Sequence, residues 1–229
     1  MPAYNAAKTL VPCFEAVPKD WVDMIILVDD ASSDNTVEIA RTLPIIVERH
    51  ASNSGYGGNQ KTCYRLARKH GADIAIMVHP DHQYDPGFIP EMIKLIIDEG
   101  TPAVFGSRMM NAGGALAGGM PKWKYIVNII LTKIGNLILG TKLTELHSGF
   151  RAYRMDIFQK IDIDRNSDDF VFDTQIIIQL VAHKITIREI PITTRYFKES
   201  SQVGFAKGIP YGLGILYNLF LYKTGLRKF

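Results

Sequence analysis

Short apolar runs alternate with amphipathic stretches of helical periodicity through the first half of the chain. The runs cover residues 24–28, 45–47, 74–78 and 103–106. Such alternation is typical of an α/β fold, in which helices flank a mostly parallel central sheet. The second half of the chain predicts helices over residues 122–140 and 172–182, a loop over residues 147–151, and short strands over residues 186–190 and 192–196. The 229 residues are enough to bury a sizeable core, so folding needs no disulfide or metal support.

Polar side chains follow three of these predicted strands at the points where the strands end. They are Asp29 and Asp30, residues 79–83, and Ser107 and Arg108. Open parallel sheets bind their ligands outside the carboxyl ends of the strands. Carboxylates there suit a metal ion or a proton transfer, and a guanidinium suits a phosphate. The sequence therefore predicts one ligand site at this edge of the sheet.

The charge of the chain is unevenly distributed. The formal net charge is +3, but residues 122–154 carry +5 and residues 198–229 carry +4, which leaves −6 on the remainder. The same two segments contain the longest apolar stretches, 125–139 and 209–222. Positive charge beside apolar side chains favours contact with an anionic membrane surface. The overall balance excludes a disordered chain and a protein that coats nucleic acid.

Two cysteines, Cys13 and Cys63, are too few for a disulfide framework or a metal cluster. We expect both to be reduced and buried as small apolar side chains. The chain start lacks the pattern of a signal peptide, and no stretch reaches the ~18 uninterrupted apolar residues of a spanning helix. These features predict a soluble or peripheral cytoplasmic protein.

Six short motifs occur in a characteristic order along the chain. They are Pro2-Ala3-Tyr4-Asn5, Val28 to Asp34, Asn53-x-Gly55, Asp81-x-Gln83-Tyr84-Asp85-Pro86, Gly106-Ser107-Arg108 and Ser148 to Tyr153. With these motifs the chain resembles the inverting family-2 glycosyltransferases, and within them the dolichol-phosphate mannose synthase branch of polyprenyl-phosphate glycosyltransferases. The resemblance covers nearly the whole length. It implies a GT-A-like fold for a nucleotide-diphospho-sugar transferase, a divalent cation and a polyprenyl-phosphate acceptor.

The start of the chain departs from this family. Its members place an apolar strand before Pro-Ala-Tyr-Asn, whereas here only Met1 precedes that motif. We therefore expect the first strand of the sheet to be truncated. The expected organisation is a GT-A-like catalytic domain over residues 1–203 and a basic amphipathic segment over residues 204–229. Within the domain, residues 1–110 or so form the nucleotide-sugar half and residues 111–203 form the acceptor half.

The resemblance assigns one set of residues to the nucleotide-sugar donor. The set is Pro2, Ala3, Tyr4, Asp29, Asp30, Lys61 and Asp81. Asp30 is the carboxylate expected to accept a hydrogen bond from the base, and residues 2–4 flank that base. For the two aspartates after the strand, the alternative is capping of the loop and the next helix, the role we assign to Asp34.

The metal-binding stretch of the mannose synthases aligns with His79, Asp81 and Gln83. In that stretch His79 stands where the mannose synthases have a carboxylate. Mg²⁺ or Mn²⁺ held by Asp81 and Gln83 would neutralise the diphosphate leaving group. A neutral imidazole suits Mn²⁺ better than Mg²⁺. The alternative for His79 is a structural role at the end of its strand.

A further set of residues falls on the acceptor side of the resemblance. The set is Arg108, Lys124, Asn128, Arg151 and Arg195. Arg108 matches an arginine that contacts phosphate, where a planar guanidinium can donate two parallel hydrogen bonds. Lys124 and Asn128 fall near a second arginine and a serine of the branch. The alternatives are an ion pair for Arg108 and a solvated charge for Arg195.

Asp81, Asp173 and Arg108 are the predicted catalytic residues. Asp173 matches the acidic position that serves as base in family members with hydroxyl acceptors. A lipid phosphate is already anionic and needs no base, so Asp173 would then position groups instead. Asp168 and Asp169 are predicted to cap the following helix.

The resulting hypothesis is a glycosyltransferase that moves a sugar from a nucleotide-diphospho-sugar to a dolichyl or undecaprenyl phosphate with inversion. It would act peripherally at the cytoplasmic face of the membrane. One alternative is transfer onto a sugar hydroxyl in cell-surface polysaccharide synthesis. Another is a catalytically impaired module that binds a nucleotide-sugar. Nucleic acid is not an expected partner.

Overall fold

The computed structural model describes residues 1–196 and 205–229, and its strands form two sheets. The first sheet, with order β1-β2-β3, is parallel and contains β1 (Pro2–Ala3), β2 (Ile26–Asp29) and β3 (Ile46–Arg49). The second, with order β4-β6-β5-β7, contains β4 (Ile74–Met77), β5 (Ala103–Ser107), β6 (Arg151–Arg154) and β7 (Ile187–Pro191). β6 runs antiparallel to both neighbours, and β5 and β7 are parallel.

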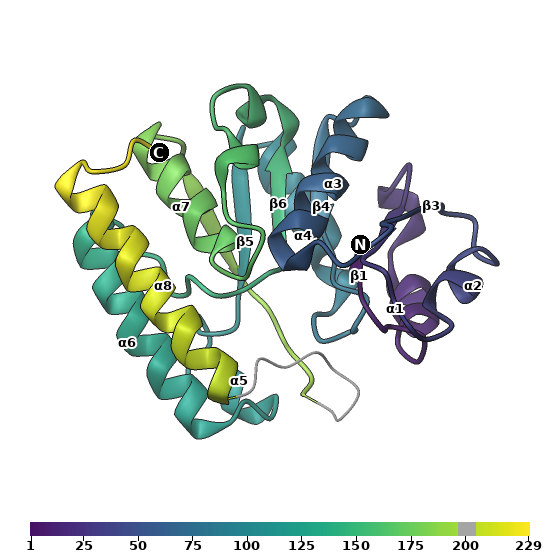
Figure 1. Cartoon of the computed structure of the whole chain (residues 1–229), viewed down its shortest axis with the longest axis horizontal. Helices are drawn as coiled ribbons and strands as arrows, with labels where there is room; N and C mark the ends of the chain where they lie inside the picture. Colours follow the sequence, from purple (N-terminus) through teal and green to yellow (C-terminus); the bar gives the residue numbers. More distant parts are fainter. Residues whose placement is uncertain (197–204) are drawn as a thin grey trace.

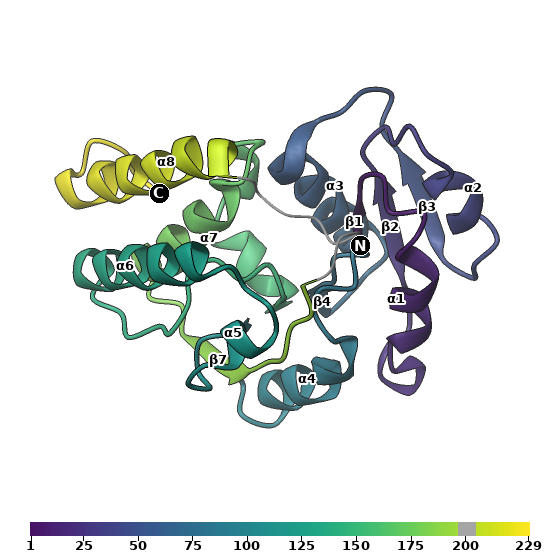
Figure 2. The same cartoon turned by 90° about the horizontal axis from the view of Figure 1, so that it is seen from below.

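Helices cover both faces of these sheets (Figure 1). They are α1 (Leu10–Ala16), α2 (Thr36–Ala40), α3 (Gly55–Lys69), α4 (Ile89–Ile97), α5 (Gly114–Ala117), α6 (Lys122–Leu139), α7 (Phe172–Ala182) and α8 (Phe205–Thr224). Short 3₁₀ turns lie at Lys19–Trp21, Pro86–Phe88, Met155–Gln159 and Ile163–Arg165. Figure 2 shows α3 and α4 on opposite sides of the strands between them.

Strand periodicity sorts the core into two layers. Successive side chains of a strand point to opposite faces of the sheet. Ala103 and Phe105 accordingly pack with α3 and α7, whereas Val104 packs with α1 and α4. Cys63 lies in the first layer and Cys13 in the second, and both are free thiols, as predicted. The mostly parallel α/β architecture expected from the sequence is confirmed.

The first strand of the sheet contains only two residues. Pro2 and Ala3, which we expected to follow a missing strand, themselves form β1 and pair with Val28 and Asp29 of β2. The ammonium group of Met1 donates to the carbonyl of Ile26 at 2.7 Å. β1 lies at one edge of its sheet, and its ladder extends only to β2.

The second half of the chain differs from the sequence predictions at two places. We expected residues 147–151 to form a loop, and β6 begins at Arg151 inside that stretch. A strand expected over residues 192–196 is limited to an isolated bridge between Tyr84 and Thr194. The predicted helices over residues 122–140 and 172–182 agree with α6 and α7 to within one residue.

Helices α6 and α8 lie side by side at one flank of the molecule in both views (Figures 1 and 2). A Cβ atom added at Gly208 would come within 3.8 Å of the Trp123 ring, and one at Gly212 within 3.9 Å of Leu131. Ile215 and Leu219 of α8 are fully buried in the first core layer. Within the described residues, no helix has both the length and the apolar character to cross a membrane.

Candidate functional site

A cavity of about 660 Å³ opens at the carboxyl ends of β1, β2, β4 and β5. Most of the predicted site residues line it. They are Pro2, Ala3, Tyr4, Asp30, His79, Asp81, Gln83, Arg108, Lys124, Asn128 and Asp173. Four predicted residues lie outside its wall, and they are Asp29, Lys61, Arg151 and Arg195. The strand topology therefore brings together residues that are up to 171 positions apart, as between Pro2 and Asp173.

The two aspartates after β2 have different surroundings. Asp30 lies in the cavity wall, where its Oδ1 accepts from the backbone N–H of Ser54 at 2.7 Å and its Oδ2 from that of Gly55 at 3.0 Å. Asp29 is fully buried, accepts from the backbone N–H of Ser32 at 3.0 Å and pairs with Arg49 at 3.6 Å. Asp29 thus braces the loop, which is the alternative that the sequence left open.

Lys61 lies outside the cavity wall, unlike most of the predicted donor site. Its ammonium group donates to the carbonyl of Asn166, to that of Asp164 at 3.2 Å and to the carboxylate of Asp168 at 2.8 Å. These bonds fix the segment that precedes α7 against α3. The lysine is therefore a structural residue in this arrangement.

The turn after β4 brings the three predicted metal ligands to the cavity. Asp81 Oδ1 accepts from the backbone N–H of Gln83 at 3.1 Å. His79 stacks on Tyr56 with ring centroids 5.5 Å apart. Burial lowers the pKa of His79 from 6.5 to about 4, so the imidazole is neutral near pH 7. Among the described residues, no cluster of three or more histidine, cysteine or acidic side chains could hold a metal.

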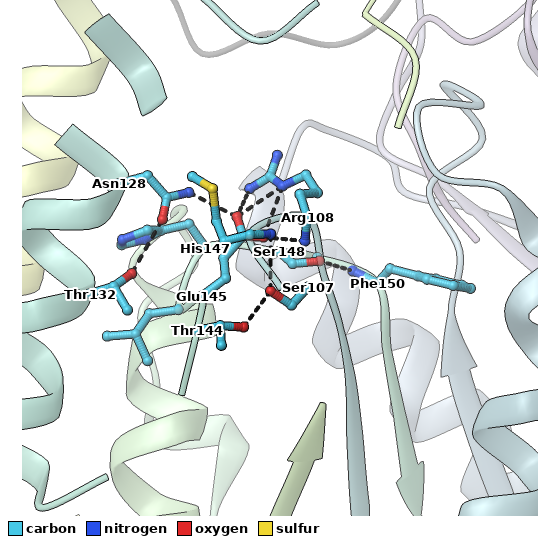
Figure 3. A network of polar contacts seen from close by, with 12 residues as sticks. Ser107, Arg108, Asn128, Thr132, Thr144, Glu145, His147, Ser148 and Phe150 are labelled. Carbon is cyan, nitrogen blue, oxygen red and sulfur yellow. Dashed lines mark hydrogen bonds and ion pairs between the residues drawn. The ribbon is translucent and has the colours of Figure 1, made fainter. Parts of the chain in front are cut away.

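Arg108 is held by a carboxylate that sequence analysis did not identify, Glu145 (Figure 3). Arg108 Nε donates to Oε1 at 2.9 Å, its Nη2 donates to the same oxygen, and its backbone N–H donates to Oε2 at 2.8 Å. Burial opposes ionisation of Glu145, but the charge and hydrogen bonds of Arg108 outweigh it and lower the pKa of Glu145. Glu145 therefore occupies the side of the guanidinium that carries Nε and one N–H of Nη2.

Two predicted acceptor residues of α6 flank this pair. Asn128 donates through Nδ2 to Glu145 Oε1 at 2.8 Å, and its Oδ1 accepts from Thr132 at 3.2 Å. Lys124 lies one turn earlier in the helix, and its pKa is lowered by partial burial and by the charge of Arg108. Both residues line the cavity.

Asp173 lies in the first turn of α7 and is buried at the cavity wall. The hydroxyl of Tyr56 donates to Asp173 Oδ2 at 2.7 Å, and Arg151 Nη1 lies 3.4 Å from Oδ1. Burial, together with the charge of Asp173, raises the pKa of Tyr56. The carboxylate is thus held between a neutral phenol and a guanidinium.

The remaining two arginines do not meet the acceptor prediction. Arg151 is buried and donates to the carbonyls of Ser148 at 2.7 Å, Asp173 at 3.0 Å and Leu146 at 3.1 Å, so its guanidinium braces the loop before β6. Arg195 is exposed, and its backbone N–H donates to the carbonyl of Gln83 at 3.0 Å. Neither side chain reaches the cavity wall.

The prediction that Asp168 and Asp169 cap α7 is wrong. Asp168 uses its carbonyl to accept from the backbone N–H of Gly57 at 2.7 Å and its carboxylate to bind Lys61. The Asp169 carboxylate accepts from the N–H of Phe170, outside the helix, at 2.7 Å. Asp169 lines the cavity instead.

Several aromatic residues of the site escaped the sequence analysis. Tyr56, Tyr84, Trp123, Tyr196 and Tyr211 all line the cavity. Their positions follow from tertiary packing, although Tyr56 stands between glycines beside a strand end, a place where a ligand-facing side chain could have been sought. Helix α6 contributes the apolar side chains of Val127 and Leu131 to the cavity wall, beside the polar Lys124 and Asn128.

Comparison with known proteins identifies the family. The family described as glycosyl transferase family 2 matches residues 1–162. The chain belongs to this family. As a member of this family it is a glycosyltransferase. Its fold is GT-A-like, since it superposes on glucosyl-3-phosphoglycerate synthase from Mycobacterium tuberculosis with a TM-score of 0.73 at 16% identity, over 99% of this chain and 79% of that one.

Three relatives in this family are similar over most of their length. An uncharacterized protein of Methanocaldococcus jannaschii is 32% identical over 97% of this chain and 90% of its own length. The UDP-N-acetylglucosamine–dolichyl-phosphate N-acetylglucosaminyltransferase of Methanococcus voltae is 29% identical over 98% and 95%. The undecaprenyl-phosphate mannosyltransferase of Micrococcus luteus is 27% identical over 84% and 81%. Two relatives of this family-2 glycosyltransferase, from Methanococcus voltae and Micrococcus luteus, are thus named for transfer to a lipid phosphate.

Proposed function

We propose that this glycosyltransferase transfers a sugar, with inversion, from a nucleotide-diphospho-sugar to a polyprenyl phosphate. The observation that carries the proposal is a single cavity whose wall combines charged groups at the strand ends with apolar side chains of α6. Asp30, Asp81 and Arg108 lie toward the strand ends, whereas Val127 and Leu131 come from α6. A sugar nucleotide suits the charged groups. A phosphate with an apolar tail needs charged and apolar groups in the same cavity. The names of the Methanococcus and Micrococcus relatives agree with this acceptor class.

The donor lies, in this proposal, over β1 and the loops after β2 and β4. Pro2 to Tyr4 and Asp30 border the base, and Tyr4 is exposed at this rim. Asp30 already accepts two backbone N–H groups, and its Oδ1 lies 2.8 Å from Nδ1 of His50. Since a carboxylate offers about four acceptor positions, one position is left for a base. Asp30 therefore fits the assigned role, whereas Asp29 and Lys61 act on loop conformation.

The donor set at the turn after β4 fits a divalent cation that the diphosphate helps to bind. Asp81 supplies a carboxylate and Gln83 an amide oxygen, the hard ligands that Mg²⁺ and Mn²⁺ prefer. His79 is neutral and adds no charge. Such a cation would neutralise the diphosphate as the glycosidic bond breaks. Oxygen atoms of the diphosphate would complete the coordination because the protein offers few ligands.

The surroundings of Asp173 favour an acceptor that brings its own negative charge. Tyr56 and Arg151 already hold its two oxygens, so accepting a proton from a hydroxyl would disturb both contacts. A phosphate oxygen is anionic near neutral pH and attacks without a base. We therefore assign Asp173 to holding the α3 and α7 sides of the cavity together.

The exposed faces of α6 and α8 support a peripheral membrane contact. Among the described residues, seven large hydrophobic side chains with exposed fractions of about one half or more lie on these helices, and they are Ile126, Ile130, Leu137, Ile209, Leu213, Tyr217 and Phe220. Neither helix contains an acidic residue, and Lys122, Lys133 and Lys223 add positive charge. An anionic bilayer can bind both the exposed apolar side chains and the positive charges. The cavity opens beside the same two helices, which would bring it close to a lipid acceptor.

The decisive experiment measures sugar transfer from a panel of labelled nucleotide-sugars to undecaprenyl and dolichyl phosphate. We expect a phosphate-linked product from one donor, and a loss of at least a hundredfold in kcat/KM for Asp81→Ala because the leaving group is no longer neutralised. Asp156→Asn, which alters an exposed carboxylate far along the chain, is the control. Undiminished transfer by Asp81→Ala would disprove the metal assignment.

The hydroxyl acceptor is tested in parallel with Asp173→Asn. A base-dependent transfer to a sugar hydroxyl should fall by about 10²–10⁴-fold in this variant, the usual contribution of general base catalysis. Transfer to a lipid phosphate should fall far less. If wild-type enzyme uses only hydroxyl acceptors and Asp173→Asn abolishes that activity, the polyprenyl-phosphate proposal is wrong.

A further inference from the structure

A buried carboxylate outside every motif singled out in the sequence controls the orientation of Arg108. Glu145 is 2% exposed and receives hydrogen bonds from the Arg108 side chain, the Arg108 backbone and Asn128. Figure 3 shows the Asn128 amide and the Arg108 guanidinium on two sides of this carboxylate. Three separate parts of the chain therefore meet at one acidic group.

Glu145 is itself fixed from the opposite side by β7. The carboxylate of Glu189 accepts from the backbone N–H of Thr144 at 2.7 Å, from its hydroxyl at 2.9 Å and from the backbone N–H of Glu145 at 3.1 Å. Ser107 and Thr144 also share a hydrogen bond of 2.6 Å. The carboxylate that holds Arg108 is thus anchored to the neighbouring parallel strands β5 and β7.

The guanidinium keeps part of its donor capacity. Arginine has five N–H donors. Contacts to Glu145 use the Nε–H and one on Nη2, and Nη1 donates to the hydroxyl of Tyr196 at 2.8 Å. These bonds leave one donor on each terminal nitrogen. Arg108 lies in the cavity wall together with Lys124, and the two cations are close enough to perturb each other.

We propose that Glu145 is a positioning residue for the acceptor phosphate. It fixes the plane of the Arg108 guanidinium so that the two remaining donors and Lys124 address one phosphate group at the cavity wall. Glu145 also balances the charge of Arg108, and Lys124 is a second cation in the same wall. The inference rests on the proposed function, because it takes the ligand to be a phosphate that carries an apolar chain.

The experiment measures binding of farnesyl phosphate to the full chain by calorimetry, without sugar transfer. For Glu145→Gln we expect at least tenfold weaker binding of farnesyl phosphate, because the guanidinium loses its orienting partner. Affinity for UDP or GDP, whichever the wild type binds, should stay within twofold. Adding Glu145→Gln to Arg108→Gln should weaken binding no further, since both changes remove the same contact. Asp156→Asn, which breaks the exposed pair with Arg154, is the matched control.

A second variant covers the case in which Glu145→Gln does not fold. Removing one partner of a buried ion pair is strongly destabilising, whereas Glu145→Asp keeps the charge and moves it by about one bond length. If Glu145→Gln melts below the assay temperature, Glu145→Asp is the variant that tests the positioning role. We expect its affinity for farnesyl phosphate to fall several-fold and its affinity for the nucleotide to stay unchanged.

The remaining outcomes separate this inference from the proposed function. Wild-type affinity in the deciding variant, an equal loss of nucleotide binding, or no binding of farnesyl phosphate by the wild type would each overturn the positioning role. If the wild type binds farnesyl phosphate but transfers no sugar to polyprenyl phosphates, the proposed function fails and the binding data still decide the role of Glu145.

Discussion

At the scale of single residues, the site is governed by which polar groups the fold leaves buried. Arg108, Arg151 and Lys61 all appear in the sequence as candidate ligand cations, yet each is engaged by the protein itself. Burying a charge requires a partner and hydrogen bonds for its remaining donors. Only Arg108 combines such a partner with a place in the cavity wall. Burial and cavity position together therefore separate a ligand-facing cation from a structural one.

Buried neutral histidine should make the protein sensitive to acid. Desolvation lowers the pKa of His147 from 6.5 to about 4, and its Nδ1 lies 3.2 Å from the hydroxyl of Tyr211. His147 therefore takes up a proton near pH 6.5 in the unfolded chain but only near pH 4 in the folded protein. The contribution of this histidine to the free energy of unfolding is complete above pH 6.5 and falls as the pH decreases from 6.5 to 4.

We accordingly predict that His147→Gln reduces the loss of unfolding free energy between pH 7 and pH 5 by about 1–2 kcal/mol, given about 1.4 kcal/mol for each pKa unit. Urea unfolding at the two pH values measures the difference. His183→Gln is the control, because His183 is exposed at the end of α7. Equal pH dependence in wild type and His147→Gln would show that His147 is not neutral and desolvated in the fold.

At the scale of elements, the sequence predicts those strands and helices whose periodicity reflects one local environment. The run over residues 103–106 and the amphipathic stretch over residues 122–140 correspond closely to β5 and α6. The sequence analysis missed β6 because the strand begins at Arg151 and ends at Arg154. An arginine at such a position suggests a solvated loop. Arg151 is buried only because carbonyls of three other residues accept its N–H groups. No local pattern contains that information.

The first turn of α3 lies too close to the segment before α7 to accept a side chain at Gly57. A Cβ atom at Gly57 would lie 2.3 Å from the carbonyl oxygen of Ser167 and 2.8 Å from Cβ of Phe172. Both neighbours are fixed, since Gly57 N–H donates to the carbonyl of Asp168 at 2.7 Å and Phe172 is fully buried. The glycine thus sets the distance between α3 and α7.

We predict that Gly57→Ala lowers the unfolding free energy by about 2–3 kcal/mol, the usual effect of overpacking. Gly212→Ala is the matched control, because its Cβ atom would meet only Leu131 at 3.9 Å. Alanine there should be neutral or stabilising by up to about 1 kcal/mol through helix propensity. Similar melting temperatures for the two variants would contradict the close approach of α3 to the segment before α7.

At the scale of the whole molecule, the net charge of +3 conceals two dissimilar regions. The sequence shows the segregation, with residues 122–154 and 198–229 basic and the remainder acidic. It could not show that α6 and α8 pack together, since their contact depends on Gly208 and Gly212 facing Trp123 and Leu131. Packing turns two apolar, basic segments into one flank beside the cavity (Figures 1 and 2).

This flank predicts how the protein should bind lipid vesicles. Binding should require anionic lipid and weaken between low salt and 0.5 M salt, because the Debye length shortens from about 10 Å at 0.1 M. Ile130→Glu and Leu213→Glu each place a carboxylate on an exposed apolar position of α6 or α8, with exposed fractions of 51% and 63%. We expect each to weaken vesicle binding at least tenfold in a sedimentation assay, through lost apolar contact and repulsion from the anionic surface.

Ile97→Glu supplies the matched control, since Ile97 is 66% exposed at the end of α4, on a different side of the molecule (Figure 2). It adds the same charge at a similarly exposed isoleucine. If it weakens binding as much as Ile130→Glu, net charge alone determines the affinity and the flank has no special role. If neither flank variant changes binding, the apolar side chains of α6 and α8 do not enter the bilayer, and the cavity must receive its acceptor from a surface other than this one.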